Sequence, residues 1–353
     1  MSAPNEGMRL ARQAYDLTSD LMAASRTVYW IDLLATAAVT YASFAMAVRA
    51  ESGLATAAWA LLCLLALYRG ISFIHEITHL RPDDVPGFRL GWNLLIGVPA
   101  LTPSLMYEGV HNLHHAKTRY GTANDPEYLP LSHYPPAKIL IFILVPLLAP
   151  LGVALRFGII APLTFVSPKV RVWATRKVSA LTINPAFART DVDQSKRLDW
   201  RAQELACWAW SWGLAGGTMA GWIPLRVIGL AAAIFAGMTF INQLRTVVAH
   251  AWLNESEPMS FEEQFLDSVN VPPPALLPLL WAPVGLRYHA LHHLLPRLPY
   301  HNLGKAHARL AGALPASYRS VEQKSLTSGL MALLQRSRSA MARRADTARA
   351  MGR

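Results

Sequence analysis

The amino-acid sequence predicts an all-α integral membrane protein: four transmembrane helices in two hairpins, with a cytoplasmic helical cap that carries clustered histidines. Hydrophobic residues make up 53% of the 353 residues and charged residues only 16%, whereas about 25% of the residues in a typical soluble domain are charged. Four apolar runs are long enough, or nearly so, to cross a hydrocarbon core, and short connections join them in pairs. The histidines cluster at the ends of these runs and in the segments between them.

The first predicted hairpin pairs residues 28–48 with residues 53–74 through the short connection Arg49–Ser52. A helix rises 1.5 Å per residue, so each of these runs spans about the 30 Å of a hydrocarbon core. The second predicted hairpin pairs residues 205–222 with residues 227–248. We therefore expect these four segments to be the membrane spans.

A fifth apolar run, residues 139–165, is also long enough to cross once, but Pro146, Pro150 and Pro162 interrupt it. A single crossing would place the histidines after residue 248 on the opposite side of the membrane from those before residue 139. A segment that lies in the interface or re-enters the membrane keeps all the clustered histidines on one side. We favour this second arrangement.

The basic residues set the expected orientation. The formal net charge is +11, and lysines and arginines gather in residues 168–199 and after residue 304. Because cytoplasmic loops carry an excess of such residues, we expect both termini to be cytoplasmic. The basic residues form no patch interleaved with aromatic residues on a polar domain, so we expect no nucleic-acid partner. The expected organisation is a cytoplasmic segment 1–27, a membrane domain 28–303 and a basic cytoplasmic tail 304–353.

Nine of the twelve histidines fall in four places: the motif HEITH, the motifs HNLHH and HALHH, and a single position directly after the last apolar run. On a helix, residues i, i+3 and i+4 project from one face, so each motif offers its imidazoles in one direction. Imidazole suits iron, zinc, copper and nickel, and nine ligands exceed what one tetrahedral zinc can use. The sequence therefore predicts two metal ions held by His75, His79, His111, His114, His115, His250, His289, His292 and His293.

Three further residues are candidates for orienting these ligands through hydrogen bonds. Asp125 and Glu127 follow the second histidine motif, although a plain loop turn at this position explains them equally well. His301 lies just beyond the third motif and is expected to hydrogen-bond a ligand or to be structural.

These motifs resemble those of the membrane fatty acid desaturase superfamily, which has three histidine boxes arranged around two transmembrane hairpins. The resemblance covers about residues 28–303. It implies that the nine histidines bind a diiron centre that uses O₂ and two electrons to attack a lipid chain. It further implies a double bond introduced into a fatty-acyl chain; the alternative on the same scaffold is a lipid or carotenoid hydroxylase or ketolase.

Details of the motifs refine what the resemblance implies. The first box has three residues between its histidines, which is similar to the acyl-lipid and sphingolipid branches. No fused cytochrome motif is present, so we expect a separate ferredoxin or cytochrome to supply the electrons. Where some members place an asparagine before the lone histidine this chain has Thr246, which leaves Asn242 and Arg245 as the nearby candidates for supporting the ligands. Residues 259–270 are similar to a segment of bacterial members, so we expect a bacterial inner-membrane protein.

Two other functions fit part of the sequence. HEITH also matches the HExxH motif of zinc proteases, in which Glu76 would act as the general base, but this leaves seven histidines unexplained. A metal transporter would need ionisable groups at the middle of the membrane, and the four predicted spans contain almost none there.

Overall fold

The computed structural model describes residues 6–190, 197–314 and 316–351. Within these ranges the regular elements are all helices, joined by loops with a few isolated β-bridges. Four helical stretches are long and apolar enough to cross a membrane: Arg26–Arg49, Gly53–His79, Pro136–Val166 and Leu225–Ala249. The predicted all-α class with four candidate spans is confirmed, but one of the four differs from the prediction.

The first hairpin consists of α2 (Arg26–Arg49) and α3 (Gly53–His79), as the sequence predicts. Serines cap both helices: the Ser25 hydroxyl accepts a hydrogen bond from the Val28 amide, and the Ser52 hydroxyl accepts one from the Ala55 amide. Such caps satisfy amide groups that the first turn of a helix leaves free. An Asp32–Arg69 ion pair then links the two helices.

The second hairpin consists of α10 (Arg197–Met219) and α11 (Leu225–Ala249), joined by a tight turn. Arg226 donates hydrogen bonds to the Ala50 carbonyl (2.6 Å) and the Thr56 hydroxyl (3.1 Å), so the turns of the two hairpins lie together. The predicted span 205–222 falls within α10, but α10 is not among the candidate spans found in the described residues. Its polar first turns, which include Arg201 and Glu204, explain the difference.

The fourth candidate span is the broken helix 136–166, which contains α6 (Pro136–Leu144), η5 (Val145–Leu148), α7 (Ala149–Ala154), η6 (Leu155–Ile160) and α8 (Ala161–Val166). Directly before it, His133 contacts the Leu253 carbonyl at 2.9 Å. Beyond its far end, the Leu181 amide donates to the Met106 carbonyl at 2.8 Å. Both partners belong to loops at the histidine-bearing end of the molecule. The segment thus leaves this end and returns to it, as a re-entrant segment does and a single crossing does not.

A buried ion-pair cluster fixes the returning part of this segment. The Arg156 guanidinium donates to the Val178 carbonyl (2.9 Å), the Ser179 hydroxyl (2.9 Å) and the Glu204 carboxylate. Arg171 donates to the second oxygen of the Glu204 carboxylate at 2.8 Å. One buried carboxylate therefore pairs with two guanidinium groups and joins the re-entrant segment to α10.

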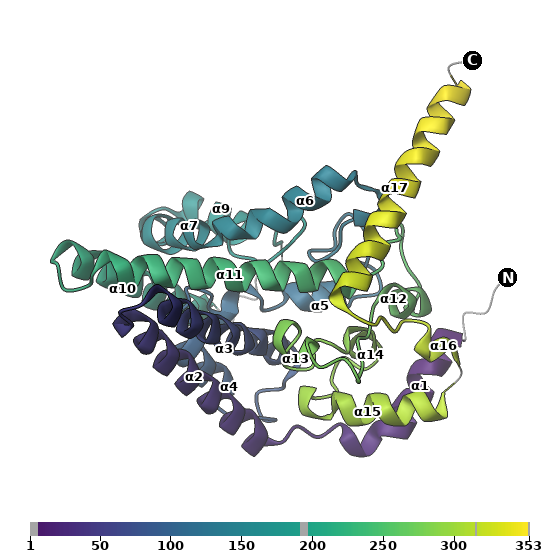
Figure 1. Cartoon of the computed structure of the whole chain (residues 1–353), viewed down its shortest axis with the longest axis horizontal. Helices are drawn as coiled ribbons and strands as arrows, with labels where there is room; N and C mark the ends of the chain where they lie inside the picture. Colours follow the sequence, from purple (N-terminus) through teal and green to yellow (C-terminus); the bar gives the residue numbers. More distant parts are fainter. Residues whose placement is uncertain (1–5, 191–196, 315, 352–353) are drawn as a thin grey trace.

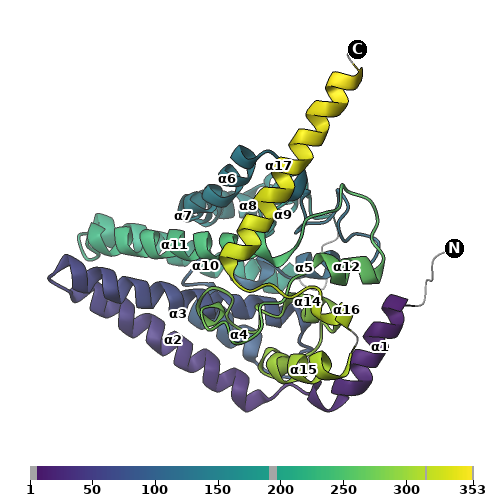
Figure 2. The same cartoon turned by 45° about the vertical axis from the view of Figure 1, so that its right-hand side comes forward.

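Most of the remaining elements lie around the histidine-bearing end (Figures 1 and 2). The exception is η2 (Asn93–Gly97), which packs against the first hairpin, where the Leu95 carbonyl accepts a hydrogen bond from the Tyr41 hydroxyl at 2.6 Å. Helices α1 and α15 lie side by side, and the second half of α17 extends away from the body. In chain order these elements are α1 (Glu6–Thr18), η1 (Ser19–Leu21), α4 (Phe88–Trp92), η2 (Asn93–Gly97), η3 (Ser104–Met106), α5 (Val110–His114), η4 (Leu131–His133), α9 (Pro168–Lys177), α12 (Phe261–Asp267), α13 (Pro278–Trp281), α14 (His289–Leu294), α15 (Tyr300–Ala313), α16 (Ala316–Arg319) and α17 (Leu326–Met351).

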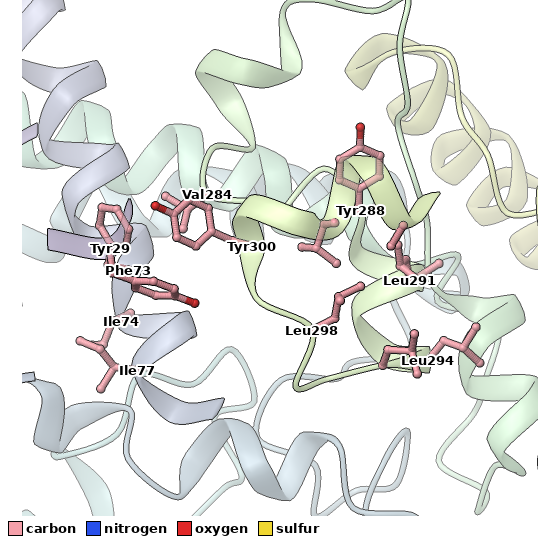
Figure 3. Packing of buried hydrophobic residues seen from close by; sticks show 14 of the residues in the cluster. Tyr29, Phe73, Ile74, Ile77, Val284, Tyr288, Leu291, Leu294, Leu298 and Tyr300 are labelled. Carbon is pink, nitrogen blue, oxygen red and sulfur yellow. The ribbon is translucent and has the colours of Figure 1, made fainter. Parts of the chain in front are cut away.

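The largest hydrophobic core joins the first hairpin to the segment that carries the third histidine motif (Figure 3). The rings of Tyr29 and Phe73 pack edge-on against Tyr300, with ring centroids 5.0 and 5.5 Å apart. Leu291 and Leu294 extend the same core from α14. Because aromatic side chains bury large areas in defined geometries, this core holds α3 and α14 in register.

Glu204→Gln should destabilise the protein, because it leaves the buried Arg156 and the half-buried Arg171 without a countercharge. Removing one partner of a buried ion pair costs about 3–5 kcal/mol. Thermal unfolding of the purified protein in detergent should therefore show a clearly lower midpoint. The control is Asp20→Asn, which removes the exposed partner of Arg309 and should change the midpoint little. Equal shifts for both variants would contradict the proposed role of the cluster.

Candidate metal centre

Four separate pieces of chain bring the nine clustered histidines together. His75 and His79 occupy the last turns of α3, and His111 and His114 lie in α5, directly followed by His115. Gly109, with φ +73°, makes the left-handed turn that starts α5; glycine adopts this conformation without steric cost. His250 is the residue after α11, and the third motif forms the short helix α14.

The structure sorts eight of these histidines into two groups of four. In each group, one ring nitrogen from every histidine lies within 4.8 Å of the others. We call the first the α3 group; it contains His75, His79, His111 and His292. The second, the α11 group, contains His114, His250, His289 and His293. Each group therefore draws on at least two of the predicted motifs.

His115, the ninth histidine, lies at the edge of the α3 group. Its Nε2 is 2.9 Å from His111 Nε2 and 3.0 Å from His292 Nε2. Its ring also lies 4.5 Å from the ring of His293 in the α11 group. This position makes His115 a candidate fifth ligand for the first ion and places the two groups next to each other.

The facing nitrogens fit metal ligands better than a hydrogen-bonded network. The Nε2 atoms of His250 and His289 lie 2.9 Å apart, and those of His289 and His293 lie 3.2 Å apart. Ligand nitrogens about 2.0–2.1 Å from one ion are separated by roughly this distance. The Nε2 atoms of His75 and His79 are buried with no hydrogen-bond partner in the described structure. Buried polar atoms rarely lack partners, so an ion is the natural partner here.

Each group has one histidine whose ring is oriented by a carboxylate. Asp125 is fully buried, and both its oxygens lie 3.0 Å from His114 Nδ1. Glu127 lies 3.1 Å from His111 Nδ1, and the Tyr107 hydroxyl donates to it at 2.9 Å. A carboxylate that accepts a hydrogen bond from Nδ1–H holds the proton on Nδ1 and leaves the Nε2 lone pair free for a metal. Asp125 and Glu127 therefore lie against the Nδ1 atoms of clustered histidines, as expected for residues that orient metal ligands. They do more than form a loop turn.

His250 is surrounded by groups that the sequence analysis did not identify. Its Nδ1 lies 3.0 Å from the Tyr120 hydroxyl, 3.3 Å from the Ser268 hydroxyl and 3.6 Å from the Asp267 carboxylate. Asp267 and Ser268 belong to residues 259–270. The similarity of this segment to one in bacterial members was the only feature of the sequence that could have drawn attention to these two residues. Backbone bonds fix this segment in place: the Ala251 amide donates to the Asp267 carbonyl at 2.6 Å.

Burial favours the neutral form of these imidazoles, which is the form that binds metals. Loss of solvent, reinforced by neighbouring histidines, lowers the pKa of six of them well below the usual value: His111, His115, His250, His289, His292 and His293. His114 differs. Burial lowers its pKa, but the adjacent Asp125 carboxylate outweighs this effect and the net pKa is raised.

In the described part of the chain, no hydrogen bond joins the other predicted supporting residues to the clustered histidines, although the charge of Arg245 helps to lower the pKa of His250 and His289. Arg245 donates to the Asn242 side chain (3.3 Å) and to the Thr246 hydroxyl (3.0 Å). His301 Nε2 instead accepts a hydrogen bond from the Ser25 amide at 3.1 Å. The hydrogen bond expected between His301 and a ligand is therefore absent from the described structure, because this ring faces the start of α2.

Glu76, the candidate general base of a zinc protease, is already engaged. Its carboxylate accepts hydrogen bonds from the Tyr29 hydroxyl at 2.5 Å and from the Tyr300 amide at 3.1 Å. These contacts brace α3 against α2 and the start of α15. Glu76 therefore has a structural role in the described geometry, and the protease hypothesis gains no support.

Comparisons with known proteins now identify the family. The model of the fatty acid desaturase family matches residues 54–325, which contain all nine clustered histidines. The chain belongs to the fatty acid desaturase family. It is also 54% identical over 340 residues to a ceramide hydroxylase of Caulobacter vibrioides, a match that covers 96% of this chain and 97% of that protein. Membership of the family makes this protein a lipid-modifying membrane enzyme, and the family resemblance noted in the sequence is confirmed.

Asp125→Asn should weaken metal binding at the α11 group, because the amide cannot stabilise His114 as the carboxylate does. Removing such a partner typically costs 10–100-fold in metal affinity. Metal content after graded chelation, measured by inductively coupled plasma mass spectrometry, should show one of two ions lost at lower chelator concentrations. Asp346→Asn, an exposed change in α17, is the control and should retain both ions. Unchanged metal retention in Asp125→Asn would contradict the role assigned to this carboxylate.

Proposed function

We propose that this protein is a diiron, O₂-dependent ceramide hydroxylase of the membrane. The observation that carries the proposal is the 54% identity to a ceramide hydroxylase along nearly the full length of both chains. Such a match includes the membrane helices, the histidine motifs and the loops between them. The paired histidine groups supply the site at which the reaction takes place.

This proposal revises the function favoured by the sequence. The histidine motifs alone favoured a desaturase, with a lipid hydroxylase as the alternative. Desaturation is not confirmed by the comparisons, and the named activity of the relative fits the alternative better. The motifs could not make this distinction, because desaturases and hydroxylases of the family share the same ligands.

The α3 group, with His115, would hold one iron ion, and the α11 group would hold the other. When bound, the two ions supply the activation of dioxygen that no amino-acid side chain can provide. The balanced reaction consumes the lipid, O₂, two electrons and two protons. One oxygen atom enters a C–H bond as a hydroxyl group, and the other leaves as water.

The chain's own residues position the lipid and limit the access of water. The α11 group is fully buried, so water is excluded from the side of the centre that it occupies. Between the hairpins lies an apolar cavity of about 710 Å³, lined by residues of α2, α3, α7, α10 and α11 such as Leu67, Phe235 and Trp210. Such a cavity can hold part of a hydrocarbon chain. Tyr68 and Met238 pack between α3 and α11 beside it.

The remaining expectations form part of the proposal. A separate ferredoxin or cytochrome supplies the two electrons. The histidine-bearing end faces the cytoplasm, which the distribution of basic residues supports. A bacterial inner-membrane location agrees with the bacterial source of the relative.

Mass spectrometry of lipids tests the activity directly. A host that makes ceramides should, on expressing this chain, accumulate ceramides heavier by the mass of one oxygen atom, and the label should come from ¹⁸O₂. The variant His292→Ala should abolish the product, because it removes a ligand of the α3 group. His133→Ala, outside both groups, is the matched control and should retain activity. Ceramides lighter by two hydrogen atoms would instead establish desaturation, and unlabelled product would exclude an oxygenase.

A further inference from the structure

A second cavity reaches the candidate metal centre from the polar side. It has a volume of about 450 Å³ and is mainly polar, and His79 of the α3 group and Glu76 form part of its wall. The other walls come from α1, the start of α2, the loop after α3 and the turn that follows α14. Because α2 begins and α3 ends here, the cavity lies at the level where a bilayer places its polar headgroups.

Several polar groups in this cavity have no protein partner. The Arg297 guanidinium, the Asp83 carboxylate and the Tyr15 hydroxyl all line it and are exposed to solvent. In the part of the chain that the structure describes, none of the three side chains has a hydrogen bond or ion pair, so each can exchange water for a ligand. Arg26 is used differently, since it donates to the carbonyls of Asp83 and Asp84 at 3.0 and 3.2 Å. The cavity therefore offers both donors and acceptors that are free for a ligand.

The mixture of charges indicates the chemistry of that ligand. Arg297 and Asp83 line the same cavity, so the Asp83 carboxylate would disfavour a phosphate there and the Arg297 guanidinium would disfavour an ammonium group. An uncharged headgroup with hydroxyl and amide groups can donate to Asp83 and accept from Arg297 at the same time. This is the headgroup of a ceramide.

We propose that the cavity between α1, α2 and the turn after α14 binds the uncharged amide and hydroxyl headgroup of the sphingolipid, with Arg297 and Asp83 as its recognition residues. The inference rests on the proposed hydroxylase function. If the headgroup binds here, the proposal also predicts which carbon of the lipid is hydroxylated. A headgroup held against His79 places the first few carbons next to the metal centre, so the new hydroxyl group lies close to the headgroup rather than in the middle or at the end of a chain.

Binding to the full-length, metal-loaded protein, measured without oxygen and without an electron donor, tests headgroup recognition without any turnover. The probe is a tritiated short-chain ceramide in detergent. Arg297→Gln and Asp83→Asn should each weaken binding by roughly tenfold, as expected for the loss of one hydrogen bond to a charged group. The controls Arg81→Gln and Asp16→Asn change exposed residues outside the cavity wall and should bind as the unchanged protein does.

A second ligand separates headgroup binding from chain binding. A fatty-acid methyl ester with the same chain lacks the amide and hydroxyl groups, so its affinity should not respond to Arg297→Gln or Asp83→Asn. If the two variants bind ceramide like the unchanged protein, or lose both ligands equally, the headgroup assignment is wrong. A phosphate-headed lipid that binds as tightly as ceramide and responds to Arg297→Gln would also overturn it.

Tandem mass spectrometry of the hydroxylated product tests the predicted position. The fragments should place the added oxygen among the first few carbons from the amide or the hydroxyl-bearing headgroup. An oxygen in the middle or at the end of either chain would overturn the headgroup proposal and leave the hydroxylase function intact. Normal ceramide binding with no hydroxylated product would have the opposite meaning, since it would contradict the proposed function and leave the binding site standing.

Discussion

Imidazole nitrogens that face one another in a buried interior are the constraint on which this structure depends. The Nε2 atoms of His111, His115 and His292 lie 2.9–3.4 Å apart. Where a carboxylate accepts a hydrogen bond from Nδ1–H, as Glu127 does from His111, the Nε2 carries a lone pair. Lone pairs directed at each other repel, and burial keeps the rings from becoming protonated. A bound cation converts this repulsion into attraction, so the arrangement is stable with metal present.

The rest of the fold holds these rings together against that repulsion. Tyr300 packs on Tyr29 and Phe73, and its amide binds Glu76 one residue from His75. This core keeps the end of α3 in place against the segment that carries α14. His250 is fixed from the other side by the segment containing Asp267. The ends of α3 and α11 thus determine where the histidine groups lie along the helices, and the surrounding loops determine how the histidine rings are oriented.

The sequence predicted what depends on local spacing and composition. The first hairpin and all nine histidines followed from apolar runs and from i, i+3, i+4 patterns. It could not predict contacts made across long separations, such as Tyr120 and Ser268 on His250. Hydropathy also could not show that residues 136–166 return to the same end, because that path depends on the buried pairing of Arg156 with Glu204. For His301 the sequence left open a structural role or a hydrogen bond to a ligand, because the direction of a side chain is a tertiary property; the structure places its ring against the Ser25 amide.

Hydroxylation and desaturation begin alike, with the removal of one hydrogen from an unactivated carbon, and they diverge in what happens next. A double bond needs a second hydrogen on the neighbouring carbon to come equally close, whereas a hydroxyl group needs only the first carbon. Placement on the sub-ångström scale therefore decides the outcome. A substrate anchored by its headgroup beside His79 has little freedom to slide along the centre, so one carbon is presented in preference to its neighbours. This constraint favours insertion of oxygen at a single carbon, the activity named for the relative that matches 96% of the chain.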